Sequence, residues 1–240
     1  LTGPVDVFDG PYGYFNLFEM DGDATPHLDA LGKAWRTAEI SFKPFPSGRA
    51  SHGAIDALSR LMQTHKFNAQ DVTDVVISVP PFVHRLGGRP VKDRMDGPYA
   101  RLCLPFLAAS LLIDGRISVG SYTLENMNDP SRLALAAKIK VEVDGNQDVN
   151  ALGPQSVSVT LADGRIVEDT VTCLLGHPDN PMTDAQHRAK FMDSAASAAQ
   201  PLAPNMAEML YARILKLQDE SDVSALSNLA AGFDIEKVPI

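Results

Sequence analysis

The sequence predicts an α+β protein: a small mixed α/β domain, with an antiparallel sheet and packed helices, flanked by helices of an incomplete all-α domain. Short β-branched runs that alternate apolar and polar residues are interleaved with segments of helical spacing. Apolar residues make up 45% of the 240 residues, enough for a sizeable core. We therefore expect residues 1–33 to end a helical domain and cross over, residues 34–175 to form the α+β domain, and residues 176–240 to return as helices.

The first expected elements are weak. Residues 3–18 are rich in glycine, proline and aromatic residues, which is typical of loops and short turns. Residues 28–33 fit a short helix that is capped near Thr25-Pro26. Residues 38–42 alternate apolar and polar side chains, so we expect a strand there.

The central elements have clearer patterns. Residues 51–65 place apolar side chains on one helical face. Residues 74–79 form a β-branched strand that ends at Pro80-Pro81. Residues 99–113 predict one apolar helix that stops at Asp114-Gly115.

The later elements include the strongest turn signal. Residues 130–137 predict a short helix, and residues 138–143 predict a strand. The alternating runs 155–161 and 165–172 flank Asp163-Gly164 and so predict a hairpin. A helix capped by Thr183 follows, and residues 201–231 predict two more helices.

Composition excludes several classes of protein. The net charge of −9 disfavours a nucleic-acid partner but leaves a local basic pocket for small anions possible. Cys103 and Cys173 lie far apart, so we expect no cysteine-bound metal and no disulfide framework, which fits a cytoplasmic protein. No apolar run is long enough for a membrane span, and no signal peptide opens the chain. Because the chain begins with Leu1, we expect a fragment of a longer protein.

The most informative segment runs from Lys43 to His52, where a strand is expected to end at a lysine and a Ser-Gly pair to begin a helix. Such a junction directs backbone N–H groups and a positive helix end at one spot, which suits a carboxylate. Lys43, Arg49 and His52 would add cationic or hydrogen-bonding groups, and a lysine or histidine there can transfer a proton. The alternative is structural: an exposed lysine, a capping Ser47 and a buried, satisfied histidine.

Four segments, in the same order, resemble the MmgE/PrpD family. KPFPSGRASHGAIDAL is similar to the family signature K-P-Y/F-P-x-G-x-x-x-H-x-x-I-D-A. The others are LTGPVDVFDGPYGYFNLF, YARLCLPFLAASLLIDG and GHPDNPMTDAQHRAKF. Members of this family include 2-methylcitrate dehydratase, cis-aconitate decarboxylase and iminodisuccinate epimerase.

The resemblance implies a large helical domain and a smaller, lid-like α+β domain, with the active site between them and no metal or organic cofactor. It implies a homodimer, and an N-terminal helical half that this sequence lacks. The implied activity is that of a hydro-lyase that removes water from a small hydroxy-polycarboxylate, as in propionate catabolism. An epimerase or isomerase, a decarboxylase, and a non-catalytic remnant or dimerisation module are the alternatives.

The resemblance also assigns candidate site residues. Lys43 matches a family lysine at the domain boundary and is expected to contact substrate, whereas His52 matches a motif histidine that is either catalytic or holds the turn. Gly48 stands where the decarboxylases have an active-site histidine, which disfavours decarboxylation. His84 is a third catalytic candidate, in a predicted loop where the decarboxylase branch has a tyrosine; a solvent-exposed loop histidine is the alternative. The expected substrate-binding residues are Ser47, Gly48, Arg49 and Arg101, of which Arg101 has an internal ion pair as its alternative.

Overall fold

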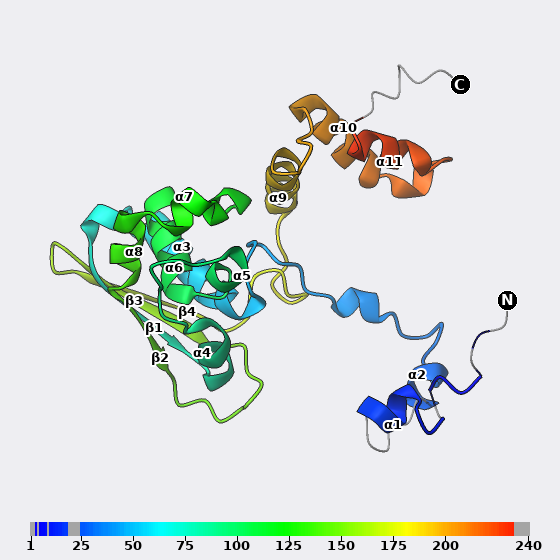
Figure 1. Ribbon diagram of the computed structural model, residues 1–240, viewed down its shortest axis with the longest axis horizontal. Coiled ribbons are helices and arrows are strands. Elements are labelled where there is room, and N and C mark those ends of the chain that lie inside the picture. The colour runs from blue at the N-terminus through cyan, green and yellow to red at the C-terminus, as the bar shows by residue number, and fades with distance from the viewer. Residues whose placement is uncertain (1–2, 4, 9, 19–24, 233–240) are drawn as a thin grey trace. The chain divides into compact units, whose positions relative to one another are not determined.

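The computed structural model describes residues 3, 5–8, 10–18 and 25–232, and the chain divides into two compact units, Leu1–Ile40 and Ser41–Ile240 (Figure 1). The first unit contains α1 (Tyr14–Phe18), α2 (Thr25–Asp29) and the 3₁₀-helix η1 (Arg36–Glu39). The expected helix at 28–33 therefore begins earlier, at Thr25. The strand expected at residues 38–42 is wrong, because η1 occupies its start and residues 40–42 join no sheet.

A four-stranded mixed sheet forms the centre of the second unit, in the order β2-β1-β3-β4. Its strands are β1 (Val72–Val79), β2 (Ile139–Val143), β3 (Gln155–Leu161) and β4 (Ile166–Val171). The pairs β1–β3 and β3–β4 are antiparallel, and the turn at Asp163-Gly164 joins the predicted hairpin. The pair β1–β2 is parallel, which corrects the expected antiparallel sheet. Its strands are joined by a long helical crossover, and such a connection permits parallel pairing.

Helices lie against one face of this sheet. α3 (His52–His65) packs on β3 and β4, and α6 (Leu104–Asp114) packs on β2 (Figure 1). β1 and β3 alternate buried and half-buried residues, so one face of each strand contributes to the core. The nine residues 104–112 of α6 are all buried, which explains why that stretch is so apolar. This arrangement confirms the α+β class.

Further helices complete the second unit. They are η2 (Arg49–Ser51), η3 (Ala69–Asp71), α4 (Pro81–Gly87), α5 (Gly97–Ala100), η4 (Val119–Tyr122), α7 (Leu124–Met127), α8 (Pro130–Ala136), α9 (Asp184–Ala196), α10 (Pro204–Ile214), η5 (Leu217–Asp219) and α11 (Ser224–Ala230). The single helix expected at 99–113 is split into α5 and α6. The break falls at Cys103, which is extended and bridges to Gly88, and Pro105 then occupies the first turn of α6.

The final helices form as the sequence predicts. Thr183 and Gln186 cap α9 reciprocally, and α10 packs against both α9 and α11. No helix in the described part of the chain has the length and apolar character needed to cross a membrane. The limits 34–175 of the α+β domain stay a prediction, since the compact units divide at Ile40.

Candidate functional site

A cleft of about 640 Å³ lies in the second unit, where the chain enters and leaves the α/β domain. One wall is the incoming segment, residues 43–46, and another is the exposed side of α3. The loop 115–119 after α6 forms a third wall, and the outgoing segment with α9 forms the last. The cleft therefore joins elements that are far apart in sequence.

Lys43 reaches this cleft because the incoming and outgoing segments are tied together beside it. The N–H of Phe42 donates to the carbonyl of Gly176 at 2.8 Å. Arg49 donates to the carbonyls of Phe42, at 3.1 Å, and Leu175, at 2.9 Å. Gly176 has a φ of +86°, and a Cβ there would lie 2.2 Å from the Phe42 carbonyl oxygen, so the crossing requires glycine. The exposed Lys43 side chain thus lines a cleft rather than open surface.

The cleft carries more basic than acidic side chains, although the chain has a net charge of −9. The basic residues in its walls are Lys43, Arg60, Arg116 and Lys190, and the acidic residues are Asp56 and Asp193. A concave, cationic surface attracts small anions, even within an acidic protein.

Only part of this positive charge is neutralised by ion pairs. Arg60 Nε lies 2.8 Å from a carboxylate oxygen of Asp169. Arg116 lies 3.7 Å from Asp193. Among the residues that the structure describes, the two cleft lysines pair with no carboxylate, so their ammonium groups are available to an anionic ligand.

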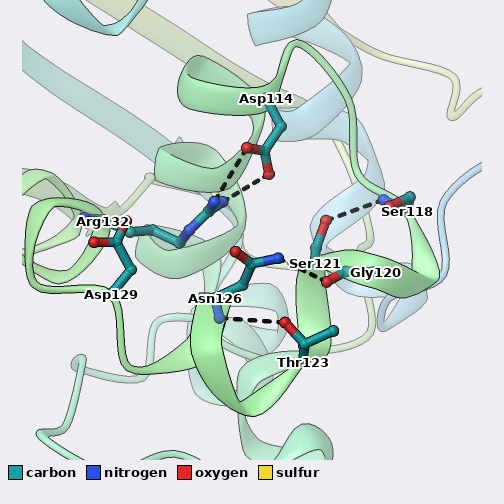
Figure 2. Close-up of polar contacts among 8 residues, drawn as sticks. All are labelled: Asp114, Ser118, Gly120, Ser121, Thr123, Asn126, Asp129 and Arg132. Atoms are coloured by element: carbon teal, nitrogen blue, oxygen red, sulfur yellow. Dashed lines mark hydrogen bonds and ion pairs between the residues drawn. The ribbon is translucent and has the colours of Figure 1, made fainter.

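The third wall is fixed by polar contacts behind it (Figure 2). Arg132 is buried and donates two hydrogen bonds to Asp114, at 2.8 and 3.1 Å, which holds the end of α6 against α8. Farther along, Asn126 donates to the carbonyl of Gly120 at 2.8 Å. These contacts bracket the loop 115–119 and set its position beside the cleft.

His52 lies in the core, with 0% of its surface exposed. Its ring meets Phe45 edge-on at 5.4 Å between ring centres, and neither ring nitrogen forms a hydrogen bond within the described residues. Burial, followed by the nearby Arg49 guanidinium, lowers the pKa of His52 from 6.5 to about 3. The imidazole is therefore neutral at physiological pH and does not reach the cleft, which favours the turn-holding role over a catalytic one.

Ser47 and Gly48 also serve the turn. Ser47 is buried, and its hydroxyl lies 2.9 Å from that of Ser51. The N–H of Gly48 donates to the carbonyl of Arg101 at 2.9 Å, and a Cβ at Gly48 would lie 2.3 Å from a methyl group of Leu102. Neither residue lines the cleft.

The remaining candidates lie elsewhere. The guanidinium of Arg49 donates its hydrogen bonds to the carbonyls of Phe42 and Leu175. Arg101 is exposed and stacks over the ring of Tyr122 at 5.0 Å, in place of the internal ion pair that was its alternative. His84 belongs to α4 and is half-buried, which corrects its expected place in an exposed loop. Of the seven predicted site residues, the structure brings Lys43 alone to the cleft wall.

Sequence reasoning missed Asp56 and Lys190 as cleft residues. Asp56 lies one helical turn after His52 in α3 and belongs to the Ile-Asp-Ala part of the motif quoted above, which was a usable signal. Lys190 lies in α9, brought to the cleft by the outgoing segment, and belongs to the last of the four quoted segments, GHPDNPMTDAQHRAKF. No group of three potential metal-binding side chains occurs within the described ranges.

The fold and cleft define an α/β domain suited to a small anion, and comparison with known proteins places it in a family. The MmgE/PrpD C-terminal domain matches residues 45–209. This match covers more than half of the chain, and the chain therefore belongs to the MmgE/PrpD family. Lys43 lies just before the matched region.

Three curated relatives carry the name cis-aconitate decarboxylase or a variant of it. The Mus musculus enzyme is 27% identical over 98% of this chain, and the Homo sapiens enzyme is 27% identical over 97%. A cis-aconitate decarboxylase-like protein of Aspergillus oryzae is 26% identical over 96%. This chain spans about half the length of each relative, 48–50%.

Proposed function

We propose that the complete protein is a cofactor-independent lyase of the 2-methylcitrate dehydratase type, which removes water from a small hydroxy-polycarboxylate. This chain would supply the cationic side of the active site. The observation that carries the proposal is Lys43: it begins the segment that resembles the family signature, lines the cleft and has no ion-pair partner among the described residues. The missing helical half and a homodimeric, cytoplasmic protein belong to the same proposal.

The proposed chemistry needs two kinds of group. A base must take a proton from the carbon next to a carboxylate, and cations must stabilise the enolate-like charge that develops. In this proposal Lys43 and Lys190 meet the carboxylates of the substrate, because Arg60 and Arg116 are paired with Asp169 and Asp193. Elimination then forms a carbon–carbon double bond as water leaves.

Decarboxylation is the second candidate, favoured by the names of the three relatives. Gly48 argues against it, because a histidine there would displace the Leu102 side chain. The same cationic cleft serves either reaction, since loss of CO₂ also leaves negative charge on carbon. Epimerisation uses this proton chemistry without loss of a group.

The test is a substrate screen of the complete protein with 2-methylcitrate, citrate and cis-aconitate. A new conjugated double bond, followed by ultraviolet absorbance, with no CO₂ released, is expected for the dehydratase. CO₂ release from cis-aconitate would assign the decarboxylase instead, and inversion without elimination would assign the epimerase. Inactivity on all polycarboxylates would refute the proposal.

Lys43→Ala in the complete protein is expected to lower kcat/KM by about 100-fold or more, because one charge-assisted contact to the substrate is lost. Lys138→Ala is the matched control, since Lys138 is an exposed lysine outside the cleft. Steady-state kinetics and circular dichroism check both variants. Unchanged turnover in Lys43→Ala would remove this residue from the site.

A further inference from the structure

Asp56 is an unpaired carboxyl group in the wall of the cleft. Two acidic residues line the cleft, and Asp193 is paired with Arg116. Asp56 forms no hydrogen bond and no ion pair with any residue in the described part of the chain. It is half-buried on α3, yet its oxygens are not sealed from solvent. A carboxyl group in this state is available to a ligand in the cleft.

The cation nearest along the helix does not neutralise it. Arg60 lies one turn beyond Asp56 on α3, a spacing that commonly gives an ion pair. Here Arg60 turns to Asp169 on β4, at 2.8 Å. Arg60 therefore pairs with the neighbouring strand instead of with Asp56 on its own helix. Asp56 is left without this partner, and it lines the same cleft as Lys43.

We infer that Asp56 is the proton-transfer residue of the cleft and acts opposite the cationic group of Lys43; this inference rests on the proposed function. In dehydration, the Asp56 carboxylate takes the proton from the carbon next to a substrate carboxylate. The electrons of that C–H bond form the double bond, and the C–O bond breaks. The departing hydroxyl takes a proton from the Lys43 ammonium and leaves as water, after which both residues exchange protons with solvent.

The surroundings of Asp56 suit a base. Burial raises its pKa, Arg60 opposes this shift, and Asp169 adds to it. From the other walls, the charged groups that face the cleft are Lys43, Lys190, Arg116 and Asp193. A carboxylate with a raised pKa is a stronger base than one in water. His52 offers no substitute, because it is sealed in the core.

The test compares Asp56→Asn with the parent in the complete protein, on the polycarboxylate that the parent turns over. General acid–base catalysis contributes about 10²–10⁴-fold, so kcat is expected to fall by at least 100-fold. The dissociation constant, measured by calorimetry, is expected to stay within about threefold, because the amide retains the shape of the carboxyl group. The acidic limb of the kcat/KM profile is expected in the parent and absent from Asp56→Asn.

Asp74→Asn is the control, since Asp74 is a carboxylate on β1 that pairs with Lys140 outside the cleft. Asp56→Glu keeps the acid and is expected to recover part of the lost rate. Turnover of Asp56→Asn within threefold of an active parent would overturn this inference alone. Equal losses in binding and turnover would also overturn it, as they indicate a binding or structural role. A parent that is inactive on every polycarboxylate would overturn the proposed function, and this inference with it.

Discussion

Lys43 and His52 belong to the same turn yet have opposite environments. Lys43 is exposed on a cleft wall, whereas His52 is sealed beneath the turn against Phe45. The proline-rich chain between them determines this division, because it carries one side chain outward and returns the other to the core. A motif can therefore contain a cleft-lining residue and a packing residue that look equally reactive in the sequence.

The buried imidazole of His52 predicts acid sensitivity. Its pKa is about 3 when folded and near 6.5 when unfolded, so between these values the unfolded chain binds more protons. Stability from this residue is therefore complete above pH 6.5 and is lost as pH falls toward 3. Between pH 7 and pH 5 the expected loss is about 2 kcal/mol.

Urea unfolding of the parent and of His52→Leu at both pH values checks this. The leucine variant is expected to lose about 2 kcal/mol less than the parent over the same interval, because it has no proton to gain. Equal losses in the two proteins would show that the imidazole is not held neutral.

The start of α3 is fixed by one buried side chain from the sheet. Gln155 at the start of β3 accepts from the N–H of Ala54 at 2.8 Å and donates to the carbonyls of Ala50, at 2.9 Å, and Leu152, at 2.6 Å. A Cβ at Gly53 would lie 2.7 Å from the Gln155 amide carbon, so helix and strand approach too closely for any larger residue. This contact sets the helix that carries Asp56.

Gln155→Leu is expected to lower the free energy of unfolding by about 2–4 kcal/mol. The substitution leaves the N–H of Ala54 and the carbonyls of Ala50 and Leu152 without the hydrogen bonds that Gln155 provides. Gln147→Leu is the matched control: Gln147 is exposed, and within the described ranges its side chain donates only to the carbonyl of Gly145. Urea denaturation measures both. A loss below 0.5 kcal/mol in Gln155→Leu would contradict this role.

Local sequence patterns predicted which segments form helices and strands better than they predicted how the strands pair in the sheet. The hairpin around Asp163-Gly164 and helix α3 follow from alternation and helical spacing, which are properties of the sequence itself. The strand expected at 38–42 failed because Ile40 and Phe42 alternate with polar residues yet are each 57% exposed and have no sheet to join. Parallel pairing of β2 was missed, because a period of two carries no direction.

The candidate site was predictable only where chemistry coincided with a motif. Lys43 satisfies both conditions. Asp56 also lies in the quoted motif, but its lack of an ion-pair partner among the described residues follows from the pairing of Arg60 with Asp169 on β4, a tertiary contact that sequence spacing does not show. Lys190 was missed for a similar reason, since α9 contributes to the cleft only after the chain has left the sheet.

Charge is distributed unevenly over the whole chain: the cleft has a basic surplus within a protein of net charge −9. We therefore expect the proposed polycarboxylate substrate to be attracted to this region and repelled elsewhere, with salt screening both effects. Raising NaCl from about 50 to about 500 mM is expected to raise KM several-fold with little change in kcat.

Lys190→Gln is expected to raise KM at low salt and to flatten this dependence, because it removes an unpaired cleft cation. Lys138→Gln, a change of the same charge outside the cleft, is the control. Steady-state kinetics at several salt concentrations measures both variants. Identical salt slopes in the two variants would contradict cleft-specific attraction.

The hydrogen bond between Phe42 and Gly176 has a consequence for modularity. It brings the two ends of the sheet-containing region to adjacent positions, so the intervening polypeptide is a self-closed loop with a complete core. Because its ends are adjacent, the segment between Phe42 and Gly176 is suited to insertion into a surface turn of another protein, with little rearrangement of either structure.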